Sequence, residues 1–236
     1  MLLIAIPKSA STSIMSTIGE LHTIEAIQQT ADYKHFPKPN ELKYLHNLHS
    51  DIREFNKEIC QKWVDDKVLY KQHIFPSRNN VELLRNTRKV VLLRDPHEVI
   101  LAYQRGVESG IHKMFKGFKY GLTSDNWLDK CKKNGLFDDL LLFYNGWKEV
   151  NDENTLIVEF EEFKKSPAKI IRSIEVFFDL ELTKREFEVH RKRYSKRKQS
   201  IYRKFRIWIK KKYTNTIYSI NLLTDLGWFP KIKDEN

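Results

Sequence analysis

The first residues of the chain place the strongest limit on its fold. Five consecutive apolar residues, Leu2–Ile6, run directly into Pro7-Lys8 and then into the small residues Ser9-Ala10-Ser11-Thr12-Ser13. A strand without polar alternation is typical of a parallel sheet covered on both faces. Small hydroxyl residues commonly begin a helix, which we expect to continue to about Gly19. The sequence therefore predicts a buried strand, a tight turn and a helix at the start of the chain.

Similar apolar runs recur along the chain, separated by helical patterns. They are Val68-Leu69-Tyr70, 90–93 and 156–158. One helical face is predicted from the spacing of Phe137, Leu140, Leu141, Tyr144 and Trp147. Ser166-Pro167 is predicted to cap and begin another helix. Strands that alternate with helices indicate an α/β domain with a central parallel sheet flanked by helices.

Composition excludes several other classes of protein. The 236 residues include 41% hydrophobic and 31% charged residues, which argues against wholesale disorder. No apolar run approaches the roughly 20 residues that span a bilayer, and the first strand lacks the basic region of a secretory signal. The two cysteines, Cys60 and Cys131, match no metal-site or CxxC spacing. We expect a cytoplasmic protein without a membrane anchor.

The net charge of +11 is concentrated near the C-terminus. Residues 189–224 contain 12 Lys/Arg and no Asp or Glu, interleaved with aromatic residues. We divide the chain into an α/β domain, 1–188, and a basic, helical C-terminal segment, 189–236. The segment suits an anionic surface or polymer, part of a nucleotide site, or simply a solvated face of a helix.

The turn after the first strand has the chemistry of a phosphate cradle. Backbone N–H groups at a helix N-terminus point at an anion, and the helix dipole favours negative charge there. Lys8 adds a cation, and Ser9, Ser11, Thr12 and Ser13 add hydroxyl donors. The G-x-x-x-x-G-K-[ST] pattern of ordinary NTPases is absent. A helix cap that binds nothing is the alternative for this loop taken alone.

Two further strands end in residues that can complete such a site. Lys71 and His73 follow the second apolar run, and Arg94 ends the third. Ligands of α/β proteins collect at the carboxyl ends of the strands, where His73 can act as a base and Arg94 can hold a phosphate. The alternatives are a surface histidine and a structural Arg94–Asp95 pair.

These residues together resemble the sulfotransferase family. Residues 7–13 resemble its 5′-phosphosulfate loop, and Lys71-Gln72-His73 resembles the lysine-threonine-histidine segment of its cytosolic-type members. Val91-Leu92-Leu93-Arg94-Asp95-Pro96 resembles the strand and arginine that bind the 3′-phosphate. A weaker match runs from Trp147 through residues 156–163. The resemblance covers about residues 1–180 and implies a three-layer, P-loop-like fold.

The resemblance also implies a reaction. The family moves the sulfuryl group of 3′-phosphoadenosine 5′-phosphosulfate (PAPS) to a hydroxyl or amine and releases adenosine 3′,5′-bisphosphate (PAP). His73 is then the catalytic base, Lys8 and Lys71 stabilise developing charge, and no metal is required. The cofactor-binding residues are those of the loop and its partner strand: Lys8, Ser9, Ala10, Ser11, Thr12, Ser13 and Arg94. Glu20 or Glu25 is held in reserve as the base, as in some glycan-modifying members.

The sequence departs from the family pattern at a few positions. Ala102 replaces a serine that binds the 3′-phosphate, Ser13 replaces an aromatic residue, and Phe160 replaces a tyrosine. These changes leave open a non-catalytic nucleotide-binding relative. The basic segment leaves open a module that binds an anionic polymer, with nucleic acid disfavoured. We expect a small-molecule or glycan acceptor, whose identity the sequence does not specify.

Overall fold

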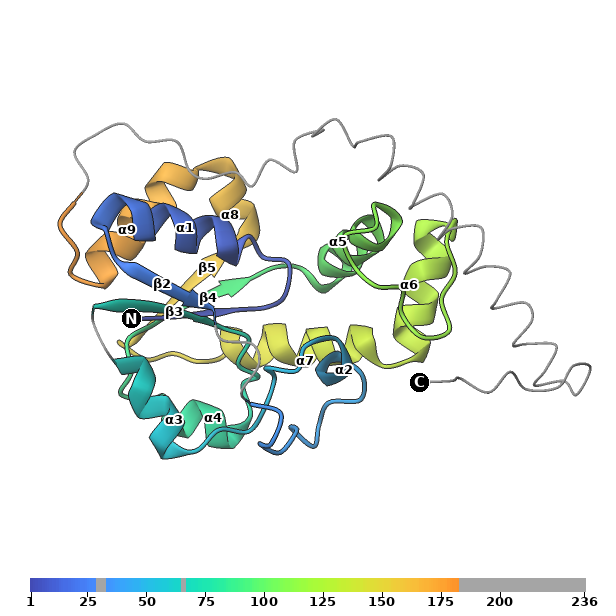
Figure 1. Cartoon of the computed structure of the whole chain (residues 1–236), viewed down its shortest axis with the longest axis horizontal. Coiled ribbons are helices and arrows are strands. Elements are labelled where there is room, and N and C mark those ends of the chain that lie inside the picture. Colours follow the sequence, from blue (N-terminus) through green and yellow to red (C-terminus); the bar gives the residue numbers. More distant parts are fainter. Residues whose placement is uncertain (29–32, 65–66, 183–236) are drawn as a thin grey trace, which may run out of the picture. The chain divides into compact units, whose positions relative to one another are not determined.

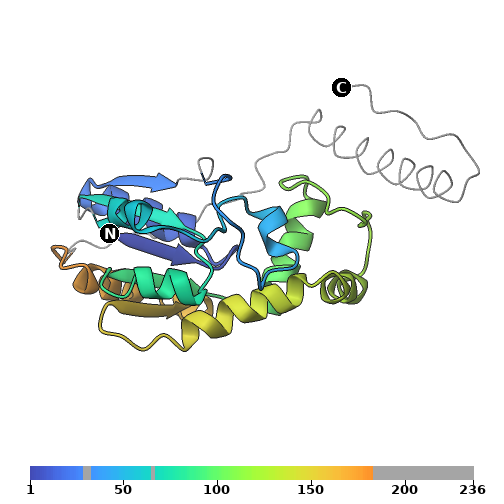
Figure 2. The same cartoon turned by 90° about the horizontal axis from the view of Figure 1, so that it is seen from below.

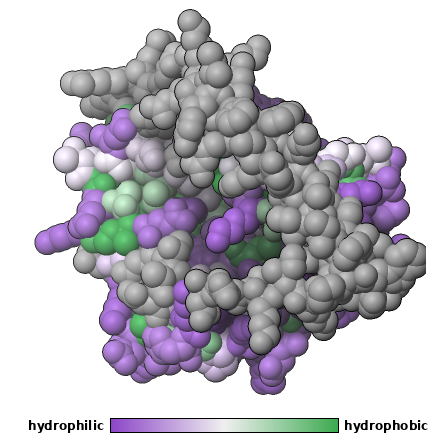
Figure 3. Space-filling model, turned by 45° about the vertical axis from the view of Figure 1, so that its right-hand side comes forward, coloured by the Kyte–Doolittle hydropathy of each residue, from purple (hydrophilic) through white to green (hydrophobic). Residues whose placement is uncertain are grey.

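The computed structural model describes residues 1–28, 33–64 and 67–182. The chain divides into two compact units, one made of residues 1–100 and 131–192 and the other of residues 101–130 and 193–236. The basic segment 189–236 predicted from the sequence lies outside the described residues. No helix in the described ranges is both long enough and apolar enough to cross a membrane. On the face shown in Figure 3, the visible hydrophobic surface forms small patches among hydrophilic side chains.

A five-stranded parallel sheet forms the centre of the first unit (Figure 1). Its strands lie in the order β2-β3-β1-β4-β5. They are β1 (Leu2–Ala5), β2 (Glu25–Gln28), β3 (Val68–Gln72), β4 (Lys89–Leu93) and β5 (Thr155–Glu159). The four strands predicted from apolar runs are confirmed. Sequence reasoning missed β2, because this edge strand is short and half-exposed and carries no continuous apolar run.

Helices cover both faces of this sheet, which confirms the predicted three-layer α/β fold. One face packs against α1 (Ser11–His22) and α9 (Pro167–Phe177), with α8 (Phe160–Lys165) beside them. The shared core includes Leu3, Leu69, Val90, Ile14 and Ile171. The other face carries α3 (Lys57–Gln61), α4 (Arg78–Leu83) and α7 (Leu136–Lys148), which lie nearest the viewer in Figure 2. Two shorter elements, α2 (Leu45–Leu48) and the 3₁₀ helix η1 (Lys62–Val64), belong to the same region.

Two details of the predicted helices are wrong. The buried face of α7 is formed by Leu136, Leu140, Phe143 and Trp147, whereas Leu141 is 40% exposed. The face was misplaced because α7 carries apolar residues around much of its circumference, so the spacing fits more than one stripe. Pro167 begins α9 as predicted, but the Ser166 side chain makes no capping hydrogen bond.

A long segment between β2 and β3 is fixed by two buried polar side chains. The Asp139 carboxylate of α7 accepts hydrogen bonds from the backbone N–H groups of Lys43, Tyr44 and Leu45 at 2.6–2.9 Å. The Asn80 amide donates to the carbonyl oxygens of Arg53 and Phe75 and accepts from the N–H of Phe55. The segment therefore keeps a defined path although it adds no strand to the sheet.

The described part of the second unit, residues 101–130, has its own small aromatic core. It includes the C-terminal part of α5 (Pro96–Glu108) and most of α6 (Ser124–Lys133). Tyr103, Phe115, Phe118 and Trp127 are buried against one another with ring centroids 4.6–5.5 Å apart. Edge-on and tilted pairs at such distances are favourable. The stretch between α5 and α6 thus contributes two aromatic residues, Phe115 and Phe118, to a packed core.

The connection between β1 and α1 contains two non-glycine residues with left-handed backbone. Lys8 has φ 68° and Ala10, at the N-cap of α1, has φ 65° and ψ 12°. This conformation costs an L-residue about 1–2 kcal/mol relative to glycine. The turn is closed by hydrogen bonds from Ser13 N–H to Ala10 O and from Ser9 Oγ to Ile6 O, both 2.8 Å.

The three hydrogen bonds to Asp139 should make a measurable contribution to stability. We expect Asp139→Ala to lower the free energy of unfolding by about 3 kcal/mol, because it leaves buried backbone donors without their acceptor. The neighbouring Asp138→Ala is the control, since Asp138 is half-exposed and only pairs with exposed Lys43. Urea unfolding should show a change within about 0.5 kcal/mol for this control. Equal losses in the two variants would contradict the role given to Asp139.

The left-handed Ala10 should respond to glycine in the opposite way from an ordinary helical alanine. We expect Ala10→Gly to raise the free energy of unfolding by about 0.5 kcal/mol, since relief of strain exceeds the extra freedom of the unfolded chain. Ala102→Gly, in α5, should lower it by about 1 kcal/mol. Denaturant titrations of both variants check this, and destabilisation by both would show that the turn is not strained at Ala10.

Candidate active site

The order of the strands brings the predicted site residues together at one edge of the sheet. Because β1 lies between β3 and β4, the turn that follows β1 has the ends of β3 and β4 on its two sides. Lys8 follows β1, Lys71 and His73 lie at the end of β3, and Arg94 follows β4. Lys71 is in register with Leu3, which belongs to the core beneath α1. Lys71 therefore faces the layer that contains α1.

The loop after β1 can hold an anion mainly through its backbone. The first amides of α1 have no acceptor within the helix, and the helix dipole favours negative charge beside them. Alternation of left-handed and right-handed backbone also turns successive N–H groups to one side. Ser9 is buried, and its hydroxyl is engaged by Ile6 O rather than directed to a ligand. Ser11 is also buried, whereas Thr12 and Ser13 are partly exposed.

Two lysine side chains supply positive charge to this loop. Burial, together with the nearby ammonium group of Lys71, lowers the pKa of Lys8 from its usual value to about 8. Lys71 itself is only 4% exposed. Two cations placed so close together repel one another in a partly desolvated site. A bound anion would offset this repulsion.

His73 lies beside the lysines and is hydrogen-bonded to a residue that sequence reasoning missed. Its Nδ1 atom is 2.7 Å from Oδ2 of Asp51. Both side chains are less than one tenth exposed. Burial raises the pKa of the Asp51 carboxyl, but the charge and hydrogen bond of His73 outweigh this effect and hold the pKa below its usual value. Asp51 is therefore a buried carboxylate.

A second histidine packs against this pair. The ring of His49 meets that of His73 edge to face at 4.7 Å, and His49 Nδ1 is 4.0 Å from Oδ1 of Asp51. Burial, and after it the positive charge of His73, Lys8 and Lys71, lowers the pKa of His49 well below its usual value and outweighs the opposite effect of Asp51. His49 is therefore neutral at pH 7. Among the described residues, His49, Asp51 and His73 also form a group whose ligand atoms lie within 4.8 Å of one another.

Arg94 contacts the loop from the opposite side. Its Nη1 donates to the carbonyl oxygen of Lys8 at 2.8 Å, and its Nη2 donates to Glu98 Oε2 at 3.0 Å. The guanidinium also lies over the ring of Phe160, 4.0 Å from the centroid. The partner acid is thus Glu98 rather than the Asp95 considered from the sequence. Asp95 instead accepts the backbone N–H of Glu98 in the first turn of α5.

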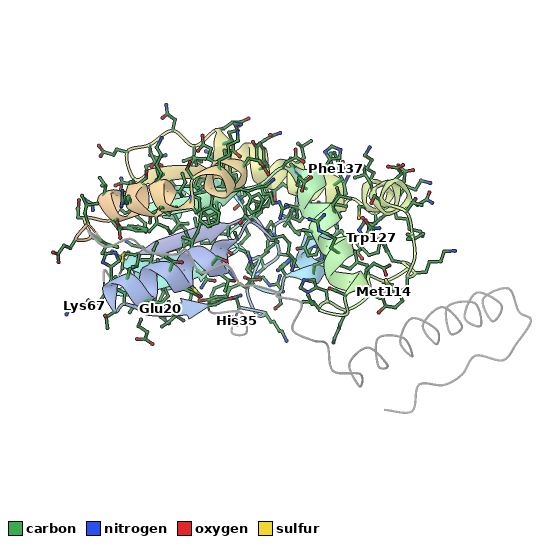
Figure 4. All side chains as sticks on the ribbon, turned by 90° about the horizontal axis from the view of Figure 1, so that it is seen from above. Glu20, His35, Lys67, Met114, Trp127 and Phe137 are labelled. Carbon is green, nitrogen blue, oxygen red and sulfur yellow. The ribbon has the colours of Figure 1, made fainter. Side chains whose placement is uncertain are left out.

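The reserve bases lie away from this edge. Glu20 lies in the last turn of α1, roughly 14 Å of helical rise from Ser11 at 1.5 Å per residue. Figure 4 shows Glu20 toward the same end of the first unit as Lys67, which precedes β3. Glu25 begins β2 in register with Val68, at the amino end of the strands. The geometry therefore favours His73 over both glutamates.

Sequence reasoning missed Asp51 and His49 for an identifiable reason. They lie between α2 and α3, in a stretch with no strand or helical periodicity. Asp51 meets His73 across 22 residues of sequence. The closely spaced His49 and Asp51 are the only local signal, and such a pattern occurs in many surface loops.

Comparisons with known proteins bear on the family and the fold. A model of the sulfotransferase domain family matches residues 1–217. Among solved structures, mouse sulfotransferase SULT7A1 complexed with PAP has 17% identity and a TM-score of 0.50 over 78% of this chain and 59% of its own. The sulfotransferase from Alicyclobacillus acidocaldarius has 15% identity and a TM-score of 0.48 over 79% of this chain and 85% of its own.

These likenesses differ in what they support. The chain spans somewhat more than half the length of the mouse protein, and at such low identity the match to it shows the fold alone. No curated protein sequence matches the chain. The family match covers nearly the whole chain, including every residue of the site described above. The chain therefore belongs to the sulfotransferase domain family.

Proposed function

We propose that the protein transfers a sulfuryl group from PAPS to a hydroxyl group of a small-molecule or glycan acceptor. The observation that carries this proposal is the placement of Lys8, Lys71 and His73 at one edge of the sheet beside the N-terminus of α1. Belonging to the sulfotransferase family supports the reaction class. Bound PAPS would supply an activated sulfuryl group on its 5′-phosphate.

The donor set fits a ligand with two separate phosphates. The loop amides, Thr12, Ser13 and Lys8 are assigned to the 5′-phosphosulfate. Arg94 is assigned to the 3′-phosphate. Its present partner Glu98 is 46% exposed, so this carboxylate can turn to solvent when a phosphate takes its place on the buried guanidinium. Such a cluster of cations in a largely buried setting favours a ligand with several negative charges, since Lys71 and Arg94 are each less than one tenth exposed.

Each side chain then has one task in the transfer. An imidazole nitrogen of His73 takes the proton of the acceptor hydroxyl as the acceptor oxygen forms its bond to sulfur. The sulfur–oxygen bond to the 5′-phosphate breaks, and Lys8 neutralises the electron pair that stays on that oxygen in the departing PAP. Lys71 stabilises the negative charge on the oxygens of the sulfuryl group while that group is transferred. Positioning and charge neutralisation thus account for most of the catalysis, as in phosphoryl transfer.

Removal of the base should separate turnover from nucleotide binding. We expect His73→Ala to lower turnover by about 10²-fold or more, the range for loss of general base catalysis, and to change the Kd of PAP by less than about threefold. Transfer of labelled sulfuryl from PAPS to a panel of a phenol, a primary alcohol and a desulfated glycan measures turnover. Exposed His35→Ala, labelled in Figure 4, is the control and should keep full activity. Unchanged turnover in His73→Ala would remove His73 from the reaction.

The pKa of Lys8 gives PAP binding a defined pH dependence. Below pH 8 Lys8 is protonated and attracts the 5′-phosphate, whereas above about pH 8 the ligand-free protein loses this proton. PAP stabilises the protonated form, so affinity must fall as pH rises through 8, at most tenfold per pH unit. Calorimetric titrations between pH 7 and 9.5 should show this fall.

Variants of two lysines test whether the pH dependence of PAP binding is due to Lys8. Lys8→Met should bind PAP more weakly at pH 7 and show no fall above pH 8, whereas exposed Lys57→Met should behave as the wild type. A wild-type affinity that does not change between pH 7 and 9.5 would contradict a role for Lys8 in binding. Absence of saturable PAP binding at tens of micromolar protein would contradict the proposed cofactor.

A further inference from the structure

The proposed base has a buried partner that fixes which of its nitrogens carries hydrogen. An ionised carboxylate can only accept hydrogen bonds, and the pKa of Asp51 lies below its usual value. Nδ1 of His73, 2.7 Å from Oδ2 of Asp51, must therefore be the donor. In the neutral ring only one nitrogen carries a proton, so Nε2 is left with a lone pair.

We infer that Asp51 is a positioning residue that holds His73 in the Nδ1-protonated form. Nε2 is then the atom that takes the proton from the hydroxyl group of the substrate. The inference rests on the proposed function and deepens it. Asp51 does not exchange a proton in the step. It keeps the ring in one orientation and stabilises the positive charge that appears on the imidazole when Nε2 is protonated.

The backbone around Asp51 is held in place by hydrogen bonds. Asp51 lies next to Ile52, whose N–H donates to His49 O at 3.2 Å in a turn, and Asn80 fixes the following residues through Arg53 O and Phe55 N–H. The Asp51 side chain is only 4% exposed. A carboxylate so enclosed is retained at low cost only if its partner stays in place. The pair is thus held from both sides, by the turn and by the end of β3.

The charged and titratable groups around His73 favour this inference over a metal site. They are Asp51 and His49 from the turn, Lys71 from β3 and Lys8 from the loop after β1. His49, Asp51 and His73 would suit a divalent transition ion by ligand type. However, a dication would bring two further charges beside two lysines, and it would displace the Nδ1 proton that bonds to Asp51. Because His49 is neutral, the single negative charge of Asp51 is balanced by the single positive charge that develops on the imidazole of His73.

The nitrogen spectrum of the protein tests the inference directly. Long-range ¹H–¹⁵N spectra at pH 8 distinguish a protonated Nδ1 from a protonated Nε2 in each neutral histidine, and His73→Gln assigns the signal. We expect the wild type to show His73 protonated at Nδ1, and Asp51→Asn to show a mixture of the two forms. His73 protonated at Nε2 in the wild type would overturn the inference.

Steady-state kinetics test the consequence for turnover. Asp51→Asn should lower kcat for sulfuryl transfer to the best acceptor of the panel by about 10²-fold or more, with KM for PAPS and Kd for PAP within about threefold. The acid limb of its kcat/KM profile should also move to lower pH, because an amide no longer stabilises the protonated ring. Asp51→Glu, which keeps the charge, should recover part of kcat, and exposed Asp138→Asn should match the wild type. A loss of kcat with no shift of the acid limb would mark a merely structural role and overturn the inference.

Zinc titration decides the competing interpretation. With Zn²⁺ alone as the probe, wild type and His49→Gln should both lack submicromolar binding by calorimetry. Submicromolar binding that is lost in His49→Gln would make the cluster a metal site and overturn the inference. Failure of the proposed function is separately visible as absence of PAP binding, whereas the nitrogen spectrum is read without donor or acceptor.

Discussion

Pairing of β1 on both sides is the constraint on which the site depends. Its residues are fully buried, and they register with Tyr70–Gln72 of β3 on one side and with Lys89–Leu92 of β4 on the other. Because all three strands are parallel, their carboxyl ends fall at one edge. Lys8 is therefore placed between the end of β3, with its lysine and histidine, and the arginine that follows β4. A slip of one residue in the pairing of β1 with β3 would turn Lys71 away from α1.

The electrostatics of that edge favour an anion, which supports the proposed binding of a nucleotide. Burial lowers the pKa of both Lys8 and His49, and the positive charge of nearby lysines adds to this effect. Arg94 adds a third cation, whose fork is divided between the Lys8 carbonyl and an exposed carboxylate. Only Asp51 provides a buried negative charge among the contacts described for this cluster, and that charge is directed at His73. In the proposed reaction, the group that takes a proton is therefore separate from the groups that hold anions.

Much of the fold could be predicted from the sequence, whereas only part of the site could. The strands β1, β3, β4 and β5 each contain a continuous apolar run and were therefore predicted, whereas the half-exposed β2 contains none and was missed. Four site residues could be predicted because each follows or ends such a strand: Lys8, Lys71, His73 and Arg94. Asp51 was not, since its position depends on tertiary contacts of Asn80 and on a turn without periodicity. The exposed Leu141 was wrongly assigned to the core because the apolar surface of α7 is wider than the stripe that this helix buries.

The way in which the segment between β2 and β3 is attached has a consequence for how this protein can vary. Asp139 and Asn80 hold it through backbone N–H and carbonyl groups, which every residue type except proline offers alike. Side chains at positions 43, 44, 45, 53 and 55 can therefore change without loss of those anchoring bonds. The path of the segment that places Asp51 beside His73 thus depends on Asp139 and Asn80 more than on the identity of the residues that they anchor.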